Sequence, residues 1–337
     1  MGQGAPRYVD ATTLTVVNKA QPGGPSLQRL DVSRYPELPA QVHTYMTYTT
    51  GLAVAFRTDS RNLYARWSTS DPATSNNTTL INQCGLDLYI RKEGHWTFAG
   101  VGTPGWSHHH ASPVVENMNA GEKECLLYLP LFNRLDTLEI GIDSTATLVP
   151  LDNPFRKKVV VIGSSITHGA SAGRPGLTYP ALLERALDVE FCNLGACGLC
   201  KLDPFYSEIA ADSKADAFLF DAFSNPNARE IEERLVPFVQ RIRSAHPTTP
   251  LIFLQTEVRE TGTFDRKKRA YEERKRLAAE AGMKELMATD ENLYFINPGM
   301  PLGEDHDGTT DGVHPNDAGF AHIVRHLIPH LREILNK

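Results

Sequence analysis

Two short motifs, far apart along the chain, contain the residue types of a serine-dependent reaction centre. Ser165 lies in the small-residue turn Gly163-Ser164-Ser165, directly after an apolar run over residues 159–162, and Asp311-Gly312-Val313-His314 lies near the C-terminus. An aspartate close before a histidine can hold the imidazole in one tautomer and stabilise the cation that forms when the ring takes a proton from a serine. By itself Ser165 could cap a helix, and the Asp-x-x-His pair could bind a metal or cap a loop. Together they predict Ser165 as a nucleophile that Asp311 and His314 activate.

Two further segments contain polar groups that could stabilise the negative oxygen of an acyl-transfer intermediate. Residues 193–198 end in Gly198, and residues 221–225 end in Asn225. A backbone N–H at a glycine, together with a side-chain amide from a neighbouring loop, could bind such an oxygen. Either segment alone could be an ordinary turn. The prediction depends on their position at the ends of successive strands.

The elements that must bring these segments together alternate between strands and helices. Apolar runs are followed by helical stretches, with strands at 159–162, 191–194, 217–220, 251–254 and 293–296 and helices at about 178–188, 227–245, 265–282 and 316–335. Continuous apolar strands between amphipathic helices predict a parallel sheet covered on both faces. Ligands of such sheets bind beyond the carboxyl ends of the strands, where the candidate segments begin.

The first half of the chain has a different pattern. Short apolar runs with Gly, Asn, Asp and Pro between them occur at residues 52–56, 63–67, 86–90, 125–129 and 138–142. Short strands at such spacing predict an antiparallel β-sandwich or jelly roll. The turn-prone sequence Asp152-Asn153-Pro154 suggests a boundary, which divides the chain into an N-terminal β-domain (1–152) and a C-terminal α/β domain (153–337).

Composition excludes some classes of partner. The chain has 337 residues, 41% hydrophobic and 22% charged, with a net charge of −6. Its densest basic cluster, at 266–276, is interrupted by Glu272 and Glu273, which favours a solvated helix face over a nucleic-acid site. Without a long apolar run we expect no membrane span. The start of the chain lacks signal-peptide features, so the protein is either cytosolic or exported with its signal removed, and we favour the second alternative.

Three other groups of residues have alternative interpretations. Cys192, Cys197 and Cys200 are interpreted as buried thiols or a local disulfide, because no second ligand pair for zinc is found. The run His108-His109-His110 is expected to be an exposed loop rather than a metal site. Large aromatic residues of the first half could stack on sugars, but they more often fill a core: Trp67, Tyr89, Trp96 and Trp106. No metal or cofactor is therefore expected.

The combination of motifs resembles the SGNH (GDSL-like) hydrolases. Gly-x-Ser at Ser165, a glycine after the second strand, an asparagine after the third and a late Asp-x-x-His follow the order of that family. Gly85-Leu86-Asp87-Leu88-Tyr89 and Arg174-Pro175-Gly176 resemble more narrowly its two-domain subgroup, which has an N-terminal GxDLY β-domain. The resemblance implies a flavodoxin-like α/β/α sandwich preceded by a β-sandwich.

The resemblance also implies roles for single residues. Ser165 would be the nucleophile, His314 the general base and then acid, and Asp311 its orienter, while Ser165 N–H, Gly198 N–H and the Asn225 side chain would form the oxyanion hole. Asn225 is chosen over Asn227 by its distance from Pro237. Three more residues are expected to bind substrate: His168, Arg174 and Arg259. Arg259 could bind an anionic group such as a uronate, or form a surface ion pair with Glu257.

The activity implied is hydrolysis of small acyl esters, with O-acetyl groups of a carbohydrate as the expected substrate. The alternatives are a thioesterase, a short-chain acyl lipid hydrolase, or a glycan-binding protein without catalysis. The oligomeric state and the sugar are left open.

Overall fold

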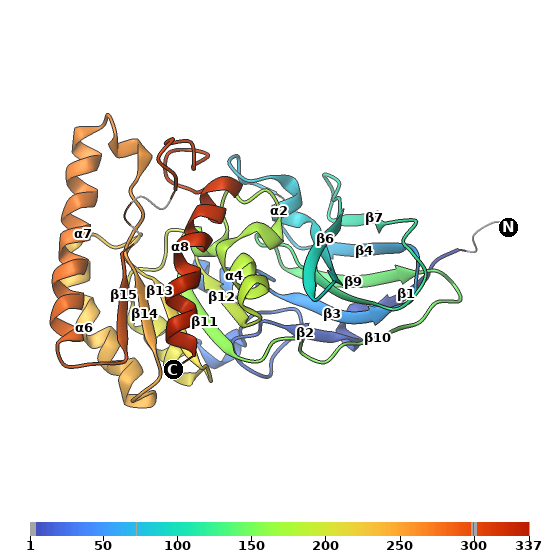
Figure 1. Cartoon of the computed structure of the whole chain (residues 1–337), viewed down its shortest axis with the longest axis horizontal. Helices are drawn as coiled ribbons and strands as arrows, with labels where there is room; N and C mark the ends of the chain where they lie inside the picture. The colour runs from blue at the N-terminus through green and yellow to red at the C-terminus, as the bar shows by residue number, and fades with distance from the viewer. Residues whose placement is uncertain (1–4, 72, 298, 300–301, 337) are drawn as a thin grey trace.

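The computed structural model describes residues 5–71, 73–297, 299 and 302–336. Two domains lie side by side along the long axis of the molecule, with the antiparallel sheets at one end and the parallel sheet with its helices at the other (Figure 1). This arrangement confirms the prediction of a β-sandwich followed by an α/β/α domain.

The N-terminal domain is a sandwich of two antiparallel sheets. Within the described residues one sheet has the order β1-β9-β4-β7 and the other β10-β3-β8-β5-β6, with β2 paired to β3. Alternate side chains such as Phe56, Trp67 and Leu127 fill the space between the sheets, as period-2 patterning requires. The strands are β1 (Arg7–Asp10), β2 (Thr15–Val17), β3 (Ala53–Thr58), β4 (Leu63–Thr69), β5 (Leu86–Lys92), β6 (His95–Gly102), β7 (His109–Val115), β8 (Lys123–Tyr128), β9 (Leu135–Ile142) and β10 (Leu148–Pro150).

The C-terminal domain contains a parallel sheet of order β12-β11-β13-β14-β15. Side chains of β11 alternate between two cores: Val159 and Val161 face one, while Val160 and Ile162 face the other. Both faces are therefore buried, which explains the continuous apolar runs. The strands are β11 (Lys158–Gly163), β12 (Glu190–Gly195), β13 (Ala217–Asp221), β14 (Leu251–Leu254) and β15 (Leu293–Ile296).

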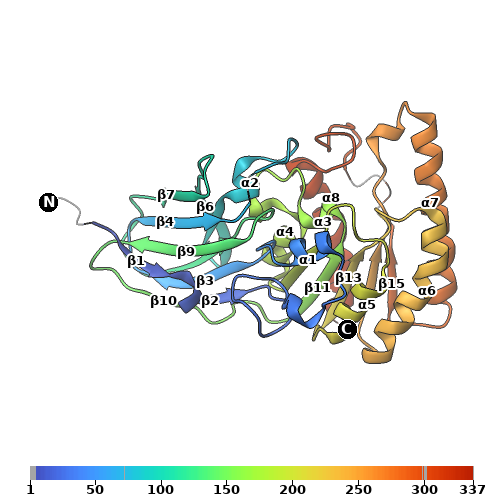
Figure 2. The same ribbon diagram turned by 180° about the vertical axis from the view of Figure 1, so that it is seen from behind.

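Helices cover both faces of this sheet. Helices α4 and α8 pack on one face, which is the nearer one in Figure 1, and α5, α6 and α7 pack on the other (Figures 1 and 2). The sequence predicted four of these helices but not α5. The helices of the domain are α3 (Ser165–His168), α4 (Tyr179–Leu187), α5 (Pro204–Asp212), α6 (Ala228–Ala245), α7 (Arg266–Met287) and α8 (Asp317–Leu335), with short 3₁₀ turns at Pro175–Leu177 and Glu260–Gly262.

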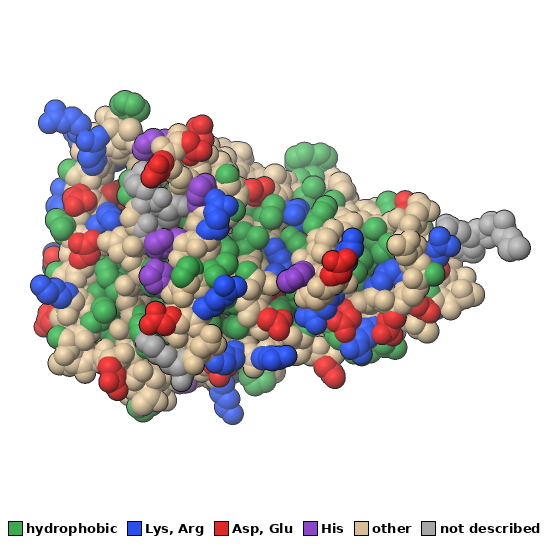
Figure 3. Space-filling view, in the orientation of Figure 1, with side chains coloured by type: hydrophobic (Ala, Val, Ile, Leu, Met, Phe, Trp, Pro, Cys, Tyr) green, Lys and Arg blue, Asp and Glu red, His purple; other side chains and the backbone are tan. Residues whose placement is uncertain are grey.

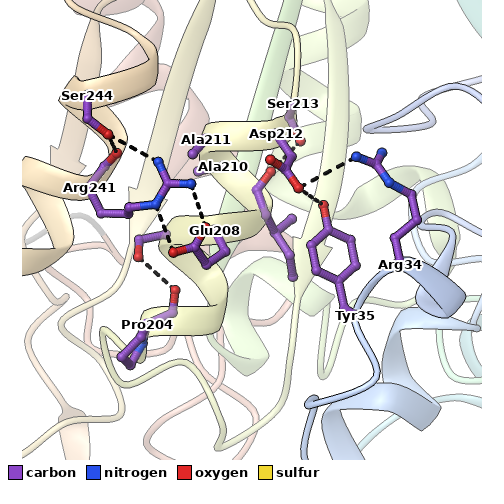
Figure 4. Close-up of polar contacts among 12 residues, drawn as sticks. Arg34, Tyr35, Pro204, Glu208, Ala210, Ala211, Asp212, Ser213, Arg241 and Ser244 are labelled. Carbon is purple, nitrogen blue, oxygen red and sulfur yellow. Dashed lines mark hydrogen bonds and ion pairs between the residues drawn. The ribbon is translucent and has the colours of Figure 1, made fainter.

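An N-terminal segment crosses from the β-domain to the parallel-sheet domain. Helix α1 (Ala40–Met46) packs Val42 and Met46 into the same core as β11. Before it, Tyr35 donates a hydrogen bond of 3.0 Å to Asp212 at the end of α5, next to the Glu208–Arg241 ion pair that ties α5 to α6 (Figure 4). The expected boundary at residue 152 lies between the antiparallel sheets and the parallel sheet. The segment with α1 precedes this boundary in sequence but packs on the parallel-sheet domain.

The Gly-Leu-Asp-Leu-Tyr motif forms an ionic clasp between the domains. Asp87 is fully buried and accepts hydrogen bonds from Arg174 at 2.7 and 2.8 Å and from the Gly176 N–H at 2.8 Å. The same arginine donates to the Tyr89 hydroxyl at 2.7 Å. A Cβ on Gly176 would lie 2.6 Å from the Tyr89 ring, so only glycine allows this close approach. We call Asp87, Tyr89, Arg174 and Gly176 the clasp.

The surface of the protein has a mixed charge distribution. On the face shown in Figure 3, basic and acidic side chains lie among each other without a large patch of one sign. Across the described part of the chain, no helix has the length and apolar character needed to cross a bilayer.

Candidate active site

The turn after β11 presents Ser165 at the carboxyl edge of the parallel sheet. Ser164 caps the short helix α3 by accepting a hydrogen bond from Ile166 N–H at 3.1 Å, and it donates through its own hydroxyl to Asp221 at 2.5 Å. Asp221 ends β13 and also accepts from Thr167 at 3.0 Å. The neighbouring strand thus fixes the backbone on both sides of Ser165.

Ser165, His314 and Asp311 form a continuous chain of hydrogen bonds, which we call the candidate triad. Ser165 Oγ lies 2.9 Å from His314 Nε2, and His314 Nδ1 lies 2.7 Å from Asp311 Oδ2. An ionised carboxylate only accepts, so the ring proton is on Nδ1 and Nε2 is free to accept the proton of Ser165. The arrangement can therefore perform the base-assisted attack of a serine hydroxyl on a carbonyl carbon.

Asp311 is held as a carboxylate by its surroundings. Burial acts to raise its pKa, but the hydrogen bonds from the His314 backbone N–H, the His314 ring and Asn77 outweigh burial and hold the pKa well below the ordinary value. Asp311 Oδ1 accepts from the N–H groups of Val313 and His314 at 3.0 and 2.8 Å. Asp311 thus stays charged at any pH at which the protein would work.

Gly198 and Asn225 lie on the same cleft wall as Ser165. Gly198 has φ +71°, a conformation that favours glycine, and a side chain there would point into open space. Asn225 Oδ1 accepts from Cys200 N–H at 3.2 Å, which leaves its NH₂ group to face the cleft. Asn227 caps helix α6 instead. The geometry therefore favours the choice of Asn225 as an oxyanion donor.

A buried lysine that the sequence did not single out supports the Asn225 loop. Lys275 on α7 is 2% exposed and donates to the Ser224 carbonyl at 2.9 Å, and it forms an ion pair with Glu272. Burial lowers its pKa, although Glu272 opposes the shift. Ser224 also donates to Asp221 at 2.8 Å, so the loop is tied to the turn that carries Ser165.

Ser165 and His314 of the candidate triad line a cleft of about 1150 Å³ between the two domains. Its walls include α1 and the residues after it, the β-domain loop before α2 (Leu80–Cys84), the loops that follow the strands of the parallel sheet, and the first half of α7. Tyr45, Tyr48 and Tyr271 contribute aromatic faces, and Arg259 and Lys268 contribute positive charge. The cleft is thus large, open and of mixed polarity.

Two of the three residues expected to bind substrate do not reach this cleft. His168 is fully buried: Nε2 lies 2.7 Å from the Leu131 carbonyl, and its ring stacks on Phe132 at 4.2 Å. Burial, and then the charge of Arg29, lower its pKa well below the ordinary value. Arg174 is held in the clasp. The expectation of direct substrate contact is therefore corrected for both residues, because their polar atoms already have partners inside the protein.

Arg259 does line the cleft. It is 8% exposed and donates to the Val313 carbonyl at 3.0 Å, next to His314. The expected alternative, an ion pair with Glu257 at the surface, does not fit, because both side chains are buried and no ion pair joins them within the described residues. Burial, together with the charge of Asp221, raises the pKa of Glu257 to about 7, although Arg259 opposes the shift.

Comparison with known proteins identifies the family. Residues 156–332 match the GDSL-like Lipase/Acylhydrolase family, and residues 6–148 match the GxDLY family, described as the N-terminus of SGNH-hydrolase-type esterases. A GDSL-like lipase from Bacteroides ovatus is 44% identical, with 98% of each chain covered and a TM-score of 0.96. The chain belongs to the GDSL-like lipase/acylhydrolase family.

More distant solved structures share the fold of this GDSL-like protein. A salicylyl-acyltransferase from a tetracycline biosynthetic pathway is 21% identical over 98% of this chain and 97% of that chain, with a TM-score of 0.76. A family two carbohydrate esterase from Cellvibrio japonicus is 12% identical over 98% of both chains, with a TM-score of 0.64. A search of the curated proteins finds no match. The two-domain arrangement thus occurs in proteins with different names and little sequence identity.

The cysteines, the histidine run and Trp106 of this GDSL-like chain lie outside the candidate triad. All five cysteines are free thiols, and burial raises the pKa of Cys197 to about 12. The expectation of an exposed loop is wrong for His110, which lies in β7, is 5% exposed and packs against the core residue Trp67. Trp106 by contrast is 89% exposed. Among the described residues, no group of three or more His, Cys, Asp or Glu side chains could hold a metal ion.

The sequence did not reveal that the β-domain contributes to this site. Asn77 donates to Asp311 Oδ2 at 2.8 Å, although residues 72–77 had the composition of an ordinary turn. The repeated Asn, Ser and Thr in that turn were the available signal, because such side chains hydrogen-bond neighbouring loops. Their target could not be read from the sequence, since it lies in the other domain.

Proposed function

We propose that this GDSL-like protein is a serine esterase that hydrolyses small acyl esters through an acyl-serine intermediate. The observation that carries the proposal is the chain of hydrogen bonds from Ser165 Oγ through His314 to Asp311, with distances of 2.9 and 2.7 Å, on the wall of a large cleft. An activated serine hydroxyl next to a site that accommodates a substrate is what acyl transfer requires.

In the first half of the reaction Ser165 Oγ attacks the ester carbonyl carbon while its proton moves to His314 Nε2. The carbonyl π bond becomes a negative oxygen, which the N–H groups of Ser165 and Gly198 and the Asn225 amide bind. The intermediate then collapses, the alcohol leaves with the proton from His314, and the acyl group stays on Ser165. Water, deprotonated by His314, repeats the sequence and releases the carboxylic acid.

We propose an O-acetylated carbohydrate as the substrate. The cleft supports this choice by its size, its aromatic faces and its polar lining, because sugars combine apolar faces with many hydroxyl groups. Arg259 would bind an anionic group of such a glycan, since it lines the cleft next to His314. The name of the Cellvibrio carbohydrate esterase agrees with this substrate class. A secreted or periplasmic location would fit it and is part of the proposal.

The alternatives use the same residues differently. A thioester or a short-chain acyl lipid would undergo the same two steps, and the name of the salicylyl-acyltransferase indicates that this fold also transfers acyl groups. A glycan-binding protein without catalysis would not need Ser165 and His314 within hydrogen-bonding distance. The formed Ser165–His314 contact favours an enzyme over that alternative.

The test measures release of p-nitrophenol from p-nitrophenyl acetate by the wild type, by Ser165→Ala and by a matched control, Ser244→Ala. Ser244 is an exposed serine on α6. We expect Ser165→Ala to lose at least about 10³-fold in kcat, because the nucleophile is removed, and Ser244→Ala to match the wild type. Equal rates for all three proteins would contradict the proposed function. A panel of p-nitrophenyl esters from acetate to octanoate, and of acetylated glycans with and without uronates, then tests the acyl group and the role of Arg259.

A further inference from the structure

A loop of the β-domain reaches the candidate triad. Asn77 Nδ2 lies 2.8 Å from Asp311 Oδ2 and 3.4 Å from His314 Nδ1. Because Nδ1 carries the proton that it donates to Asp311, it cannot accept a second one, and the 3.4 Å approach is only a close contact. Asn77 thus acts on the carboxylate and not on the imidazole.

The Asn77 amide is held in one orientation. Its Oδ1 accepts hydrogen bonds from Ser75 Oγ at 2.7 Å and from Thr78 Oγ1 at 3.1 Å. The ionised Asp311 carboxylate can only accept, so the NH₂ group of Asn77, and not its oxygen, must face Asp311. The hydroxyl groups of Ser75 and Thr78 then donate to the amide oxygen and hold the other side of the amide.

A buried glutamine fixes the path of this loop. Gln83 on α2 is 4% exposed, and its Oε1 accepts from the N–H groups of Thr74 and Ser75 at 3.0 and 2.9 Å. Its Nε2 donates to the carbonyls of Ser75 and Thr78 at 3.2 and 2.7 Å. One side chain thus makes four hydrogen bonds to the loop, which is the backbone support that a precise contact needs.

The same part of the β-domain also binds the segment that follows Ser165. Thr78 Oγ1 accepts from Ser171 N–H at 3.1 Å, and Thr79 donates to the Gly173 carbonyl at 2.6 Å. Asn82 donates to the Gly169 carbonyl at 3.0 Å. The loop that contacts Asp311 is therefore anchored on the segment behind the nucleophile, and it connects two parts of the candidate triad that are far apart in sequence.

From these contacts we infer that Asn77 is a positioning residue for the Asp311–His314 pair, and that the β-domain thereby completes the active site of the proposed esterase. Asp311 Oδ2 accepts from both the His314 ring and Asn77, and Oδ1 accepts from two backbone N–H groups. Four donors leave the carboxylate one orientation. This inference depends on the proposed function, because it gives Asn77 a role in that reaction.

The Asn77 donor also sets how strongly Asp311 attracts a proton. A hydrogen bond to Oδ2 takes up part of the carboxylate charge, so less of it is available to stabilise an imidazolium at His314. When this donor is removed, the imidazolium becomes more stable, and the protonated, inactive ring persists to higher pH. The acidic limb of the kcat/KM profile then moves upward, which a purely structural contact between the domains would not cause.

The experiment compares Asn77→Ala and Asn77→Asp with Asn76→Ala, a control that removes an exposed asparagine one residue earlier in the same loop. kcat, KM and the pH profile of p-nitrophenyl acetate hydrolysis are measured for each protein. We expect Asn77→Ala to lower kcat about 10-fold or more, the size of one hydrogen bond to a charged group, with little change in KM. We expect the acidic limb to move to higher pH, further in Asn77→Asp because it adds a second carboxylate.

Asn77→Asp keeps the shape of the side chain and the acceptor for Ser75 and Thr78, so it tests the inference even if Asn77→Ala disturbs the loop. Wild-type kcat and an unmoved pH profile in both variants, with Ser165→Ala inactive, would overturn the role of Asn77 and leave the proposed function intact. Lower rates with an unmoved profile would also overturn it, because they would indicate structural support alone. A wild type no faster than Ser165→Ala would overturn the proposed function itself.

Discussion

Two of the regions in which the β-domain contacts the parallel-sheet domain have opposite character. The clasp pairs the buried Asp87 with the partly exposed Arg174, whose guanidinium lies against the rings of Tyr89 and Phe98 and away from the cleft. The loop at the cleft uses neutral groups, Asn77 and Gln83, to reach the candidate triad. Ionic contacts that lack water are costly to break, whereas neutral amides can orient a carboxylate without adding charge beside it. The comparison indicates that one region holds the domains together and the other adjusts chemistry.

The largest expected effect on stability comes from breaking the clasp. Arg174→Ala leaves the fully buried Asp87 carboxylate without its counter-ion, which typically costs about 3 kcal/mol or more in the free energy of unfolding. Burial already acts to raise the pKa of Asp87, and Arg174 is the main opposing influence. Urea unfolding of the wild type, Arg174→Ala and Arg174→Lys measures the change. A stability of Arg174→Ala equal to that of the wild type would show that the clasp does not hold the domains.

A second contact away from the cleft predicts pH-dependent stability. Glu184 on α4 is fully buried and accepts from the Tyr128 hydroxyl of the β-domain at 2.5 Å, and burial raises its pKa from 4.5 to about 8. Between these values the unfolded chain releases a proton that the folded protein retains, so stability falls as pH rises across the window. Glu184→Gln removes that dependence.

The measurement for Glu184→Gln is its melting temperature relative to wild type at pH 5 and at pH 8.5. We expect the difference to shift in favour of Glu184→Gln at the higher pH, because the wild type then has to bury a carboxylate. Glu208→Gln, in the surface ion pair with Arg241, is the control: its pKa is lowered, so its contribution changes only below pH 4.5. A difference that is the same at both pH values would contradict the raised pKa of Glu184.

The sequence predicted the features that depend on local patterns, and it missed features that depend on contacts between distant residues. Strands such as 159–162 and helices such as 227–245 have local patterns, and these were predicted correctly. Helix α5 was missed because its residues are almost continuously apolar or small without a clear 3.6-residue period. Ser165 directly follows β11, so the fold determines its position at the carboxyl edge of the sheet, whereas Asp311 and His314 lie in the loop before α8.

The sequence could not assign side chains whose partners lie in the other domain. Arg174 and Arg259 are the same residue type, but they differ in their surroundings. Arg174 pairs with Asp87 of the β-domain, whereas Arg259 lines the cleft. His168 follows Ser165 closely, yet α3 turns it inward against Phe132. Asn77 differs from Arg174 and His168, because it lies in an expected turn and yet contacts the candidate triad. Each of these outcomes depends on how two domains dock, which local patterns do not encode.

Gln83→Ala is expected to give the smallest change in stability. It is also the sharpest test of the difference between the clasp and the loop at the cleft. The loop that Gln83 supports is partly exposed, so water can replace its hydrogen bonds, and we expect a loss of about 1 kcal/mol in the free energy of unfolding. Without this support Asn77 no longer faces Asp311 reliably, so kcat should fall by about the same factor as in Asn77→Ala, and the double variant should show no further loss. Additive losses would mean that Gln83 acts independently of Asn77. Arg174→Ala should show the reverse pattern, with a large loss of stability and a smaller loss of kcat in the fraction that remains folded, because the clasp has no contact with the candidate triad.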